Sequence, residues 1–172
     1  MSYIFGPRQF GNEDHVRVAH FITAARTGRA LTIYGDCKQA RDMLFVDGLA
    51  RAFRAASENN HTTPDQIFNI GGGPSNTLSV WRKFGAHLQK LKARQIPARF
   101  GSWRPGDRPC YVRDIRKAKS VLRWRPQVDK VNGVERLWKR VEANPSLFTK
   151  QDAPAPVAKL EKASAAAAGG VS

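Results

Sequence analysis

Two arginines have side chains whose chemistry suits the binding of a phosphate group. Arg41 leads directly into a predicted strand, and Arg104 opens the R-P-G-D turn at 104–107. A planar guanidinium makes two parallel hydrogen bonds to a phosphate, which the ammonium of lysine cannot do. The positions of Arg41 and Arg104 alone do not assign such a role, and each arginine is also compatible with a plain surface position.

The other residues capable of chemistry show no spacing typical of a catalytic or metal site. The four histidines have no ligand spacing, and Cys37 and Cys110 match no metal-binding pattern, so we expect two free thiols. The glycines at 71–73 lack the G-x-G-x-x-G spacing of a dinucleotide loop. Tyr34 and Lys38 are the nearest approach to a Tyr-x-x-x-Lys pair, but they belong to a G-D-x-K-Q loop of different character. We therefore predict no catalytic residue and no metal site.

The charge of the chain is its unusual bulk property. The 172 residues carry 29 Lys and Arg against 14 Asp and Glu, a formal net charge of +15. Such a balance indicates polyanionic partners or phosphate-bearing ligands, or else a solubilising surface. No apolar run approaches the ~18 residues that span a membrane. The start lacks the basic-then-apolar layout of a secretory signal, so a cytoplasmic protein is expected.

Hydrophobic periodicity predicts alternating strands and helices. The predicted strands are 1–5, 31–34, 42–46, 66–70 and 110–112, with an extended stretch at 97–103. The predicted helices are 16–27, 47–58 and 77–94, and two more that begin at 114 and at about 132. Asp47 and Asp114 are expected to cap helices, and Phe53 to face inward. Three tryptophans on apolar stripes are assigned to the core: Trp81, Trp124 and Trp138.

Strands separated by helices indicate an α/β layer architecture. The strands are few and short, and the first comes too early to belong to a complete parallel sheet. Residues 1–150 are therefore expected to be part of a larger fold. Residues 151–172 contain no aromatic side chain and end in Ala and Gly, which predicts a disordered tail.

Five motifs carry a resemblance to a known family. They are G-P-R-Q-F-G-N-E-D at 6–14, I-Y-G-D-C-K-Q-A-R-D-M-L-F-V-D at 33–47, F-N-I-G-G-G-P at 68–74, W-R-P-G-D at 103–107 and Y-V-R-D-I-R-K-A-K-S-V-L-R-W-R-P at 111–126. In this order they resemble the C-terminal half of the extended short-chain dehydrogenase/reductases, the NAD-dependent sugar-nucleotide epimerases and dehydratases. The likeness covers about residues 1–148. It implies a substrate-binding subdomain of a Rossmann-like fold without the N-terminal dinucleotide-binding half.

The resemblance implies a role for seven residues. Arg41 and Arg104 would contact the diphosphate of a nucleotide sugar such as a CDP-sugar, and Asp107 would lie near the ribose or hold its loop. Tyr34 would pack near the base, with plain core packing as the alternative. The sugar end of the pocket would be lined by Arg8, Gln9 and Asn12, each about equally compatible with no role. In complete enzymes of the family NAD takes a hydride from the sugar and returns it; this chain alone is not expected to bind NAD.

The sequence departs from the family pattern at several positions. Cys37 and Arg123 stand where the family usually has glycine, and Gly48 stands where it usually has aspartate. At a position that needs a positive φ, replacing glycine costs about 1 kcal/mol or more. Several of these changes gain an arginine, which is typical of relaxed constraint on a fragment.

Three functions compete on this sequence. The first is the nucleotide-sugar-binding part of an NAD-dependent epimerase, inactive alone and completed by a separate chain with the Rossmann half; Met1 would then correspond to an internal methionine. The second is a truncated remnant without activity. The third is a basic protein that binds nucleic acid weakly and non-specifically, because phosphate attraction needs only charge. No helix-turn-helix, zinc or RNA-binding aromatic signature supports specific nucleic-acid binding.

Overall fold

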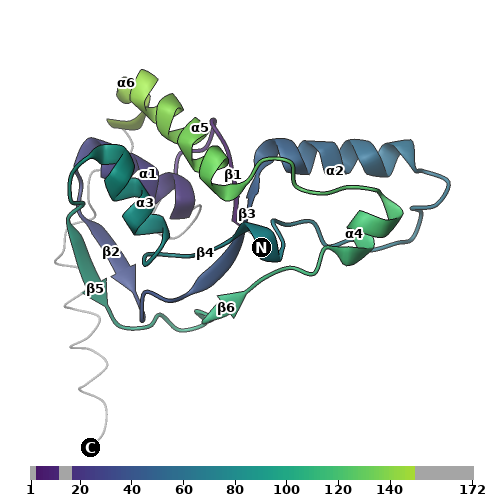
Figure 1. Ribbon diagram of the computed structural model, residues 1–172, viewed down its shortest axis with the longest axis horizontal. Coiled ribbons are helices and arrows are strands. Elements are labelled where there is room, and N and C mark those ends of the chain that lie inside the picture. The colour runs from purple at the N-terminus through teal and green to yellow at the C-terminus, as the bar shows by residue number, and fades with distance from the viewer. Residues whose placement is uncertain (1–2, 12–16, 150–172) are drawn as a thin grey trace, which may run out of the picture.

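The computed structural model describes residues 3–11 and 17–149, which fold into two small sheets with helices on both sides (Figure 1). The larger sheet is centred on β3 (Ala40–Phe45). The second half of β3 pairs in parallel with β1 (Tyr3–Phe5), in the register Tyr3↔Met43 to Phe5↔Phe45. Its first half pairs antiparallel with β4 (Thr77–Ser79) and parallel with β6 (Cys110–Tyr111). The smaller sheet joins β2 (Leu31–Tyr34) to β5 (Ala98–Gly101) in parallel.

The helices form two groups (Figure 1). One group covers the sheets at the end of the molecule that holds β2 and β5, and it comprises α1 (Arg17–Thr27), α3 (Phe84–Lys92), α5 (Lys130–Ala143) and α6 (Pro145–Thr149). The other group extends away from it and comprises α2 (Val46–Glu58) and α4 (Arg116–Val121). A single 3₁₀ turn, η1 (Pro74–Asn76), leads into β4.

Two hydrophobic clusters hold these groups together. The larger cluster lies under α1, α3 and α5 and includes Ile22, Leu31, Leu88 and Leu137, all fully buried. The smaller cluster joins β3 and α2 to α4, and its buried members are Leu44, Ala52, Ala118, Leu122 and Trp124. Because both clusters contain β3 residues, this strand is the structural centre of the chain.

Most predicted elements are confirmed, with two corrections. The strand at 31–34, the helix at 17–27 and the turn at 104–107 form where the sequence predicts them. Residues 66–70, predicted as a strand, run without a strand partner in the described chain. The predicted helix 77–94 is wrong over its first turns: residues 77–79 pair with β3, and the helix begins at Phe84.

Side-chain predictions were right for part of the core and partly wrong for the caps. Asp47 lies in the first turn of α2 rather than at its N-cap, which is Phe45. The Asp114 carboxylate does accept the backbone N–H of Arg116 (3.0 Å), although α4 is assigned from Arg116 onward. Phe53, expected to face inward, is 70% exposed. Trp124 and Trp138 are buried as predicted, and Trp81 is partly buried against the larger cluster.

Other sequence expectations receive different degrees of support. Cys37 and Cys110 are free thiols, as expected. Across residues 3–11 and 17–149 no helix has the length and apolar character needed to cross a membrane. The tail predicted at 151–172 lies outside the described residues.

Candidate functional site

The candidate site is formed by three segments that are distant in the sequence. They are the end of β2, the start of β3 and the connection from β5 to β6. The guanidinium carbon of Arg104, from the connection, lies 3.7 Å from the centroid of the Tyr34 ring at the end of β2. A cation over a desolvated aromatic face contributes about 0.5–2 kcal/mol. Two residues that the sequence assigned to one ligand are therefore in direct contact.

Asp107 is held by an arginine that the sequence did not single out. The Nη2 atom of Arg17, the first residue of α1, lies 3.1 Å from Oδ1 of Asp107. Both side chains are largely buried, with exposed fractions of 17% and 14%. This ion pair fastens the R-P-G-D turn to α1. Ninety positions separate the partners, so no local pattern could have indicated it.

Arg41 uses its guanidinium to fasten the same connection to β3. Its Nη1 donates to the carbonyl of Ala40 (2.8 Å), and its Nη2 donates to the carbonyl of Arg108 (2.6 Å). Arg41 therefore lies beside the 104–108 segment. It also has a structural task there, because it holds the strand pairing between β3 and β6 in place.

The loop at 35–39 is shaped by backbone requirements and one buried amide. Gln39 is buried, and its Nε2 donates to the carbonyl of Tyr34 (3.2 Å). Gly35 and Cys37 have φ values of 80° and 63°, which excludes a helix here. Tyr34 and Lys38 are therefore not arranged as on a helix, where residues four apart share one face.

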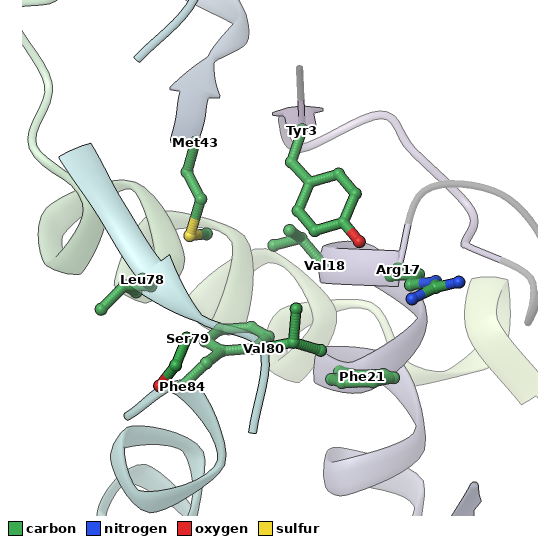
Figure 2. A pocket seen from close by; sticks show the side chains of 9 residues that line it. All are labelled: Tyr3, Arg17, Val18, Phe21, Met43, Leu78, Ser79, Val80 and Phe84. Atoms are coloured by element: carbon green, nitrogen blue, oxygen red, sulfur yellow. The ribbon is translucent and has the colours of Figure 1, made fainter. Parts of the chain in front are cut away.

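Two small cavities lie on the inner side of this site. Each has a volume of about 10 Å³, and both are lined by Arg17, Phe21 and Val80. Figure 2 shows the more apolar one, in which the hydroxyl end of Tyr3 points to the side of Arg17. Each cavity has room for about one water molecule, whereas small-molecule sites measure about 300–1,000 Å³. A ligand of that size would therefore not fit inside either cavity.

Among the residues that the structure describes, Arg8 and Gln9 make no hydrogen bond or ion pair with this cluster. Arg8 is exposed in the turn after β1. Gln9 closes that turn: its Oε1 accepts the N–H of Gly6 (3.1 Å) and its Nε2 donates to the carbonyl of Ile4 (3.1 Å). Asn12 lies outside the described residues. Their role at the sugar end of the pocket stays a prediction.

A second structural feature, around Asp42, was also missed by the sequence reading. Asp42 is fully buried, and its Oδ2 accepts the N–H groups of Gly72 (2.8 Å) and Gly73 (3.3 Å). A Cβ added at Gly72 would collide with the backbone of Met43. The glycine-rich stretch at 71–73 is therefore a tight loop around a buried carboxylate, which takes the N–H groups of Gly72 and Gly73.

The electrostatic character of the cluster is strongly positive. Four arginines, Arg17, Arg41, Arg104 and Arg108, lie on or beside the three segments, and Asp107 is the acidic side chain that the described contacts place among them. Guanidinium groups in this number suit a ligand with two neighbouring phosphates. The arrangement can orient an anionic ligand, with an aromatic ring close by for a base.

Known proteins with similar sequences belong to one group of enzymes. A model of the NAD dependent epimerase/dehydratase family matches residues 1–71. CDP-paratose 2-epimerase of Salmonella typhi is 31% identical over 144 residues, which make up 80% of this chain and 42% of that protein. UDP-glucuronate 4-epimerase of Thermodesulfobacterium geofontis is 28% identical over 133 residues, covering 77% of this chain and 39% of that protein.

Solved structures show the same partial coverage. UDP-glucuronic acid 4-epimerase from Bacillus cereus, in complex with UDP-glucuronic acid and NAD, superposes with a TM-score of 0.72 at 27% identity, over 81% of this chain and 43% of its own. UDP-glucose 4-epimerase from Thermotoga maritima, with UDP-glucose, gives 0.69 at 26% identity, over 83% and 44%. The chain spans about two fifths of the length of the curated relatives it matches. The predicted α/β fold, as part of a larger one, is confirmed.

Proposed function

The chain is related to the NAD dependent epimerase/dehydratase family, and on that premise we propose that it is the nucleotide-sugar-binding part of a sugar-nucleotide epimerase or dehydratase. The observation that carries this proposal is the convergence of Tyr34, Arg41, Arg104 and Asp107 from three separate segments. The two arginines would bind the diphosphate, and Tyr34 would lie against the base. Arg17 would keep the R-P-G-D turn in position through Asp107.

NAD chemistry is not assigned to the residues of this chain. The glycine-rich loop at 71–73 gives two N–H groups to Asp42, so it does not fit the pyrophosphate of a dinucleotide. Tyr34 and Lys38 lack the helical arrangement that would bring them onto one face. We propose that the chain alone binds its ligand without turnover, and that hydride transfer requires a polypeptide segment outside this chain.

The surface of the chain supports a partner of this kind. In the described residues β1 pairs along one side only, with β3. Parallel sheets are normally covered on both faces and extended by further strands. The nearby helix α2 begins with the exposed Val46, and Phe53 is exposed two turns later. A separate Rossmann half would extend the sheet beyond β1.

The first test of the proposal measures ligand binding by the isolated chain. Isothermal titration with UDP-glucuronic acid, UDP-glucose and a CDP-sugar is expected to detect at least one complex. Arg104→Gln and Arg41→Gln should each weaken it ~10-fold or more, because each removes a charge-assisted hydrogen bond of about 1.5–3 kcal/mol. Arg99→Gln, on the exposed side of β5, removes equal charge outside the cluster and should change the affinity less than twofold.

Two outcomes would contradict the proposal. If none of the three nucleotide sugars binds at millimolar concentration, the chain is better described as a remnant without a ligand. If Arg99→Gln weakens binding as much as Arg104→Gln, the attraction comes from overall charge and the cluster is not the site. Circular dichroism of each variant would show that the fold is intact.

A further inference from the structure

A second set of basic side chains lies at the other end of the molecule. It lines a hollow of about 410 Å³ between α2 and the segment 122–127, which connects α4 to α5. The charged residues of this hollow are Arg51, Arg54, Glu58, Arg123 and Arg125. None of them belongs to the candidate nucleotide-sugar site described above.

The hollow continues into a neighbouring one. The second hollow, of about 580 Å³, lies beside α4 and η1 and shares Arg125 and Gln127 with the first. It adds Lys119 from α4 and Ser75 from η1. Together the two hollows form an elongated surface groove with five cationic side chains and one acidic side chain; we call it the basic groove.

The charges in the basic groove are poorly balanced. Glu58 already pairs with Arg54, at 2.8 Å from its Nε. The Nε and Nη2 atoms of Arg51 are buried and have no hydrogen-bond partner among residues 3–11 and 17–149. Arg51 as a whole is half-buried, and buried guanidinium N–H groups without an acceptor carry a desolvation cost. An anion in the adjacent hollow would lower that cost through its field.

Arg123, which directly follows the C-cap of α4, has a left-handed backbone that helps to end this helix. Its φ is 50°, the left-handed conformation that favours glycine. A non-glycine residue held there costs about 1–3 kcal/mol. Arg123 therefore lines the hollow from a left-handed backbone position at which glycine would be less strained.

The groove is also firmly built. The buried Trp124, which is 4% exposed, donates from Nε1 to the carbonyl of Gly48 in α2 (2.9 Å). The N–H groups of Leu122 and Trp124 both donate to the carbonyl of Ala118 in α4 (3.1 and 3.3 Å). These bonds fix the arginine-bearing connection relative to both helices, so the charges are presented on a defined surface.

We propose that the basic groove binds the phosphodiester backbone of a nucleic acid without base specificity. A repeating phosphate chain matches five cations spread along two adjoining open hollows better than a single small anion does. The one aromatic residue that lines the groove, Trp124, is buried and engaged with Gly48, so it offers no face for stacking a base. Affinity then comes from charge alone and falls steeply with salt.

The test uses fluorescence anisotropy of a labelled single-stranded oligonucleotide of about 20 nucleotides, titrated with the full chain between about 50 and 200 mM NaCl. Arg51→Gln and Arg125→Gln are each expected to weaken binding about 3- to 10-fold and to reduce the slope of log K against log salt by about 1. Arg123→Gly is the decisive variant. It removes a groove cation while relieving a left-handed residue, so it should weaken binding by a similar factor without any loss of thermal stability.

Two matched controls accompany the Arg123→Gly variant. Cys37→Gly relieves a residue with φ 63° at no change in charge, and it should leave binding unchanged. Arg94→Gln removes an exposed charge that lines neither hollow, and it should change the affinity less than twofold. A nucleotide sugar added in excess should not displace the oligonucleotide, which separates this site from the Tyr34–Arg104 cluster.

Several outcomes would overturn the proposal. Equal losses for Arg94→Gln and Arg123→Gly would assign binding to the overall charge of +15. Displacement by a nucleotide sugar would move the oligonucleotide to the other site. Binding to vesicles containing an anionic lipid, lost in Arg123→Gly, with no oligonucleotide binding at 50 mM NaCl, would identify a membrane surface as the partner of the groove instead.

Discussion

Asp114 and Arg116 form the most closely bonded charged pair in the described chain. The Arg116 guanidinium donates from Nε to both carboxylate oxygens (3.0 Å each) and from Nη2 to Oδ2 (2.6 Å). The backbone N–H of Arg116 adds a further bond to Oδ1 (3.0 Å). The side-chain hydrogen bond from Arg116, followed by this backbone bond, lowers the pKa of Asp114 from 3.8 to about 2.

This pair gives a prediction for low pH. Because the pKa of Asp114 is depressed in the folded chain, the pair stabilises the start of α4 above about pH 4 and is lost as the pH falls through about 2. Arg116→Gln should return the pKa of Asp114 toward 3.8, which a carboxyl-carbon NMR titration can follow. Lys119→Gln, on the same helix, should leave that pKa near 2. An unchanged pKa in Arg116→Gln would show that the guanidinium is not its main cause.

At this scale the sequence allowed some predictions and not others. Cys37 and Arg123, singled out as replacements of glycine, do adopt positive φ values of 63° and 50°. The rule behind that prediction is local, because it concerns the backbone of one residue. The Arg17–Asp107 pair was missed because it depends on where α1 and the R-P-G-D turn meet in space, which no local pattern contains.

At the scale of elements, Asp42 connects β3 to the glycine-rich loop before η1. Asp42→Ala would leave the N–H groups of Gly72 and Gly73 buried without an acceptor. Each such group costs about 1–3 kcal/mol, so we expect the free energy of unfolding to fall by about 2–4 kcal/mol in urea denaturation.

A surface aspartate provides the control for this experiment. Asp36 also accepts a backbone N–H through its side chain, that of Lys38 (2.9 Å), but it is exposed. Asp36→Ala should cost less than about 1 kcal/mol, because water replaces the lost bond. Equal losses in Asp36→Ala and Asp42→Ala would show that the bonds to Gly72 and Gly73 do not hold the loop.

Element prediction failed where tertiary pairing overrode a periodic pattern. Leu78, Trp81, Phe84 and Leu88 have helical spacing, yet Leu78 pairs with Arg41 in the sheet. The helix starts only after Ser79, whose Oγ accepts the N–H of Lys83 (2.9 Å). Residues 77–79 therefore contact the core from a strand, which the spacing alone could not distinguish from a helix turn.

The exposed Phe53 shows the converse failure. The apolar face of α2 predicted an inward position for it, but only Gly48 and Ala52 of this helix are buried. Periodicity predicts which residues share a face, not how much of that face the rest of the chain covers. The sequence therefore predicted the apolar face of α2 but not that this chain leaves Phe53 on it uncovered.

At the scale of the whole molecule, the net charge of +15 dominates. Like charges repel one another in the compact state, and salt screens that repulsion. Raising NaCl from about 10 to 150 mM is expected to raise Tm by about 2–4 °C, which corresponds to about 1 kcal/mol for a chain of this size. Differential scanning calorimetry measures the shift.

The choice of anion separates screening from binding at the basic groove. At equal ionic strength, sodium sulfate should raise Tm more than NaCl. Arg51→Gln should make this extra rise smaller, and the part caused by exclusion of sulfate from the protein surface should remain. A Tm that falls as NaCl increases would instead show that surface ion pairs such as Arg26–Glu142 outweigh the repulsion.

The parallel pairing joins strands that are distant in the sequence, and this affects both the rate of folding and its timing during synthesis. Residue 31 of β2 pairs with residue 98 of β5, and residue 3 of β1 pairs with residue 43 of β3. Contacts between such distant residues close slowly, so folding is expected on the millisecond-to-second scale typical of non-local sheets. During synthesis β2 stays unpaired until residue 101 has left the ribosome. For that interval its apolar residues lack the cover of the sheet, which leaves them open to aggregation.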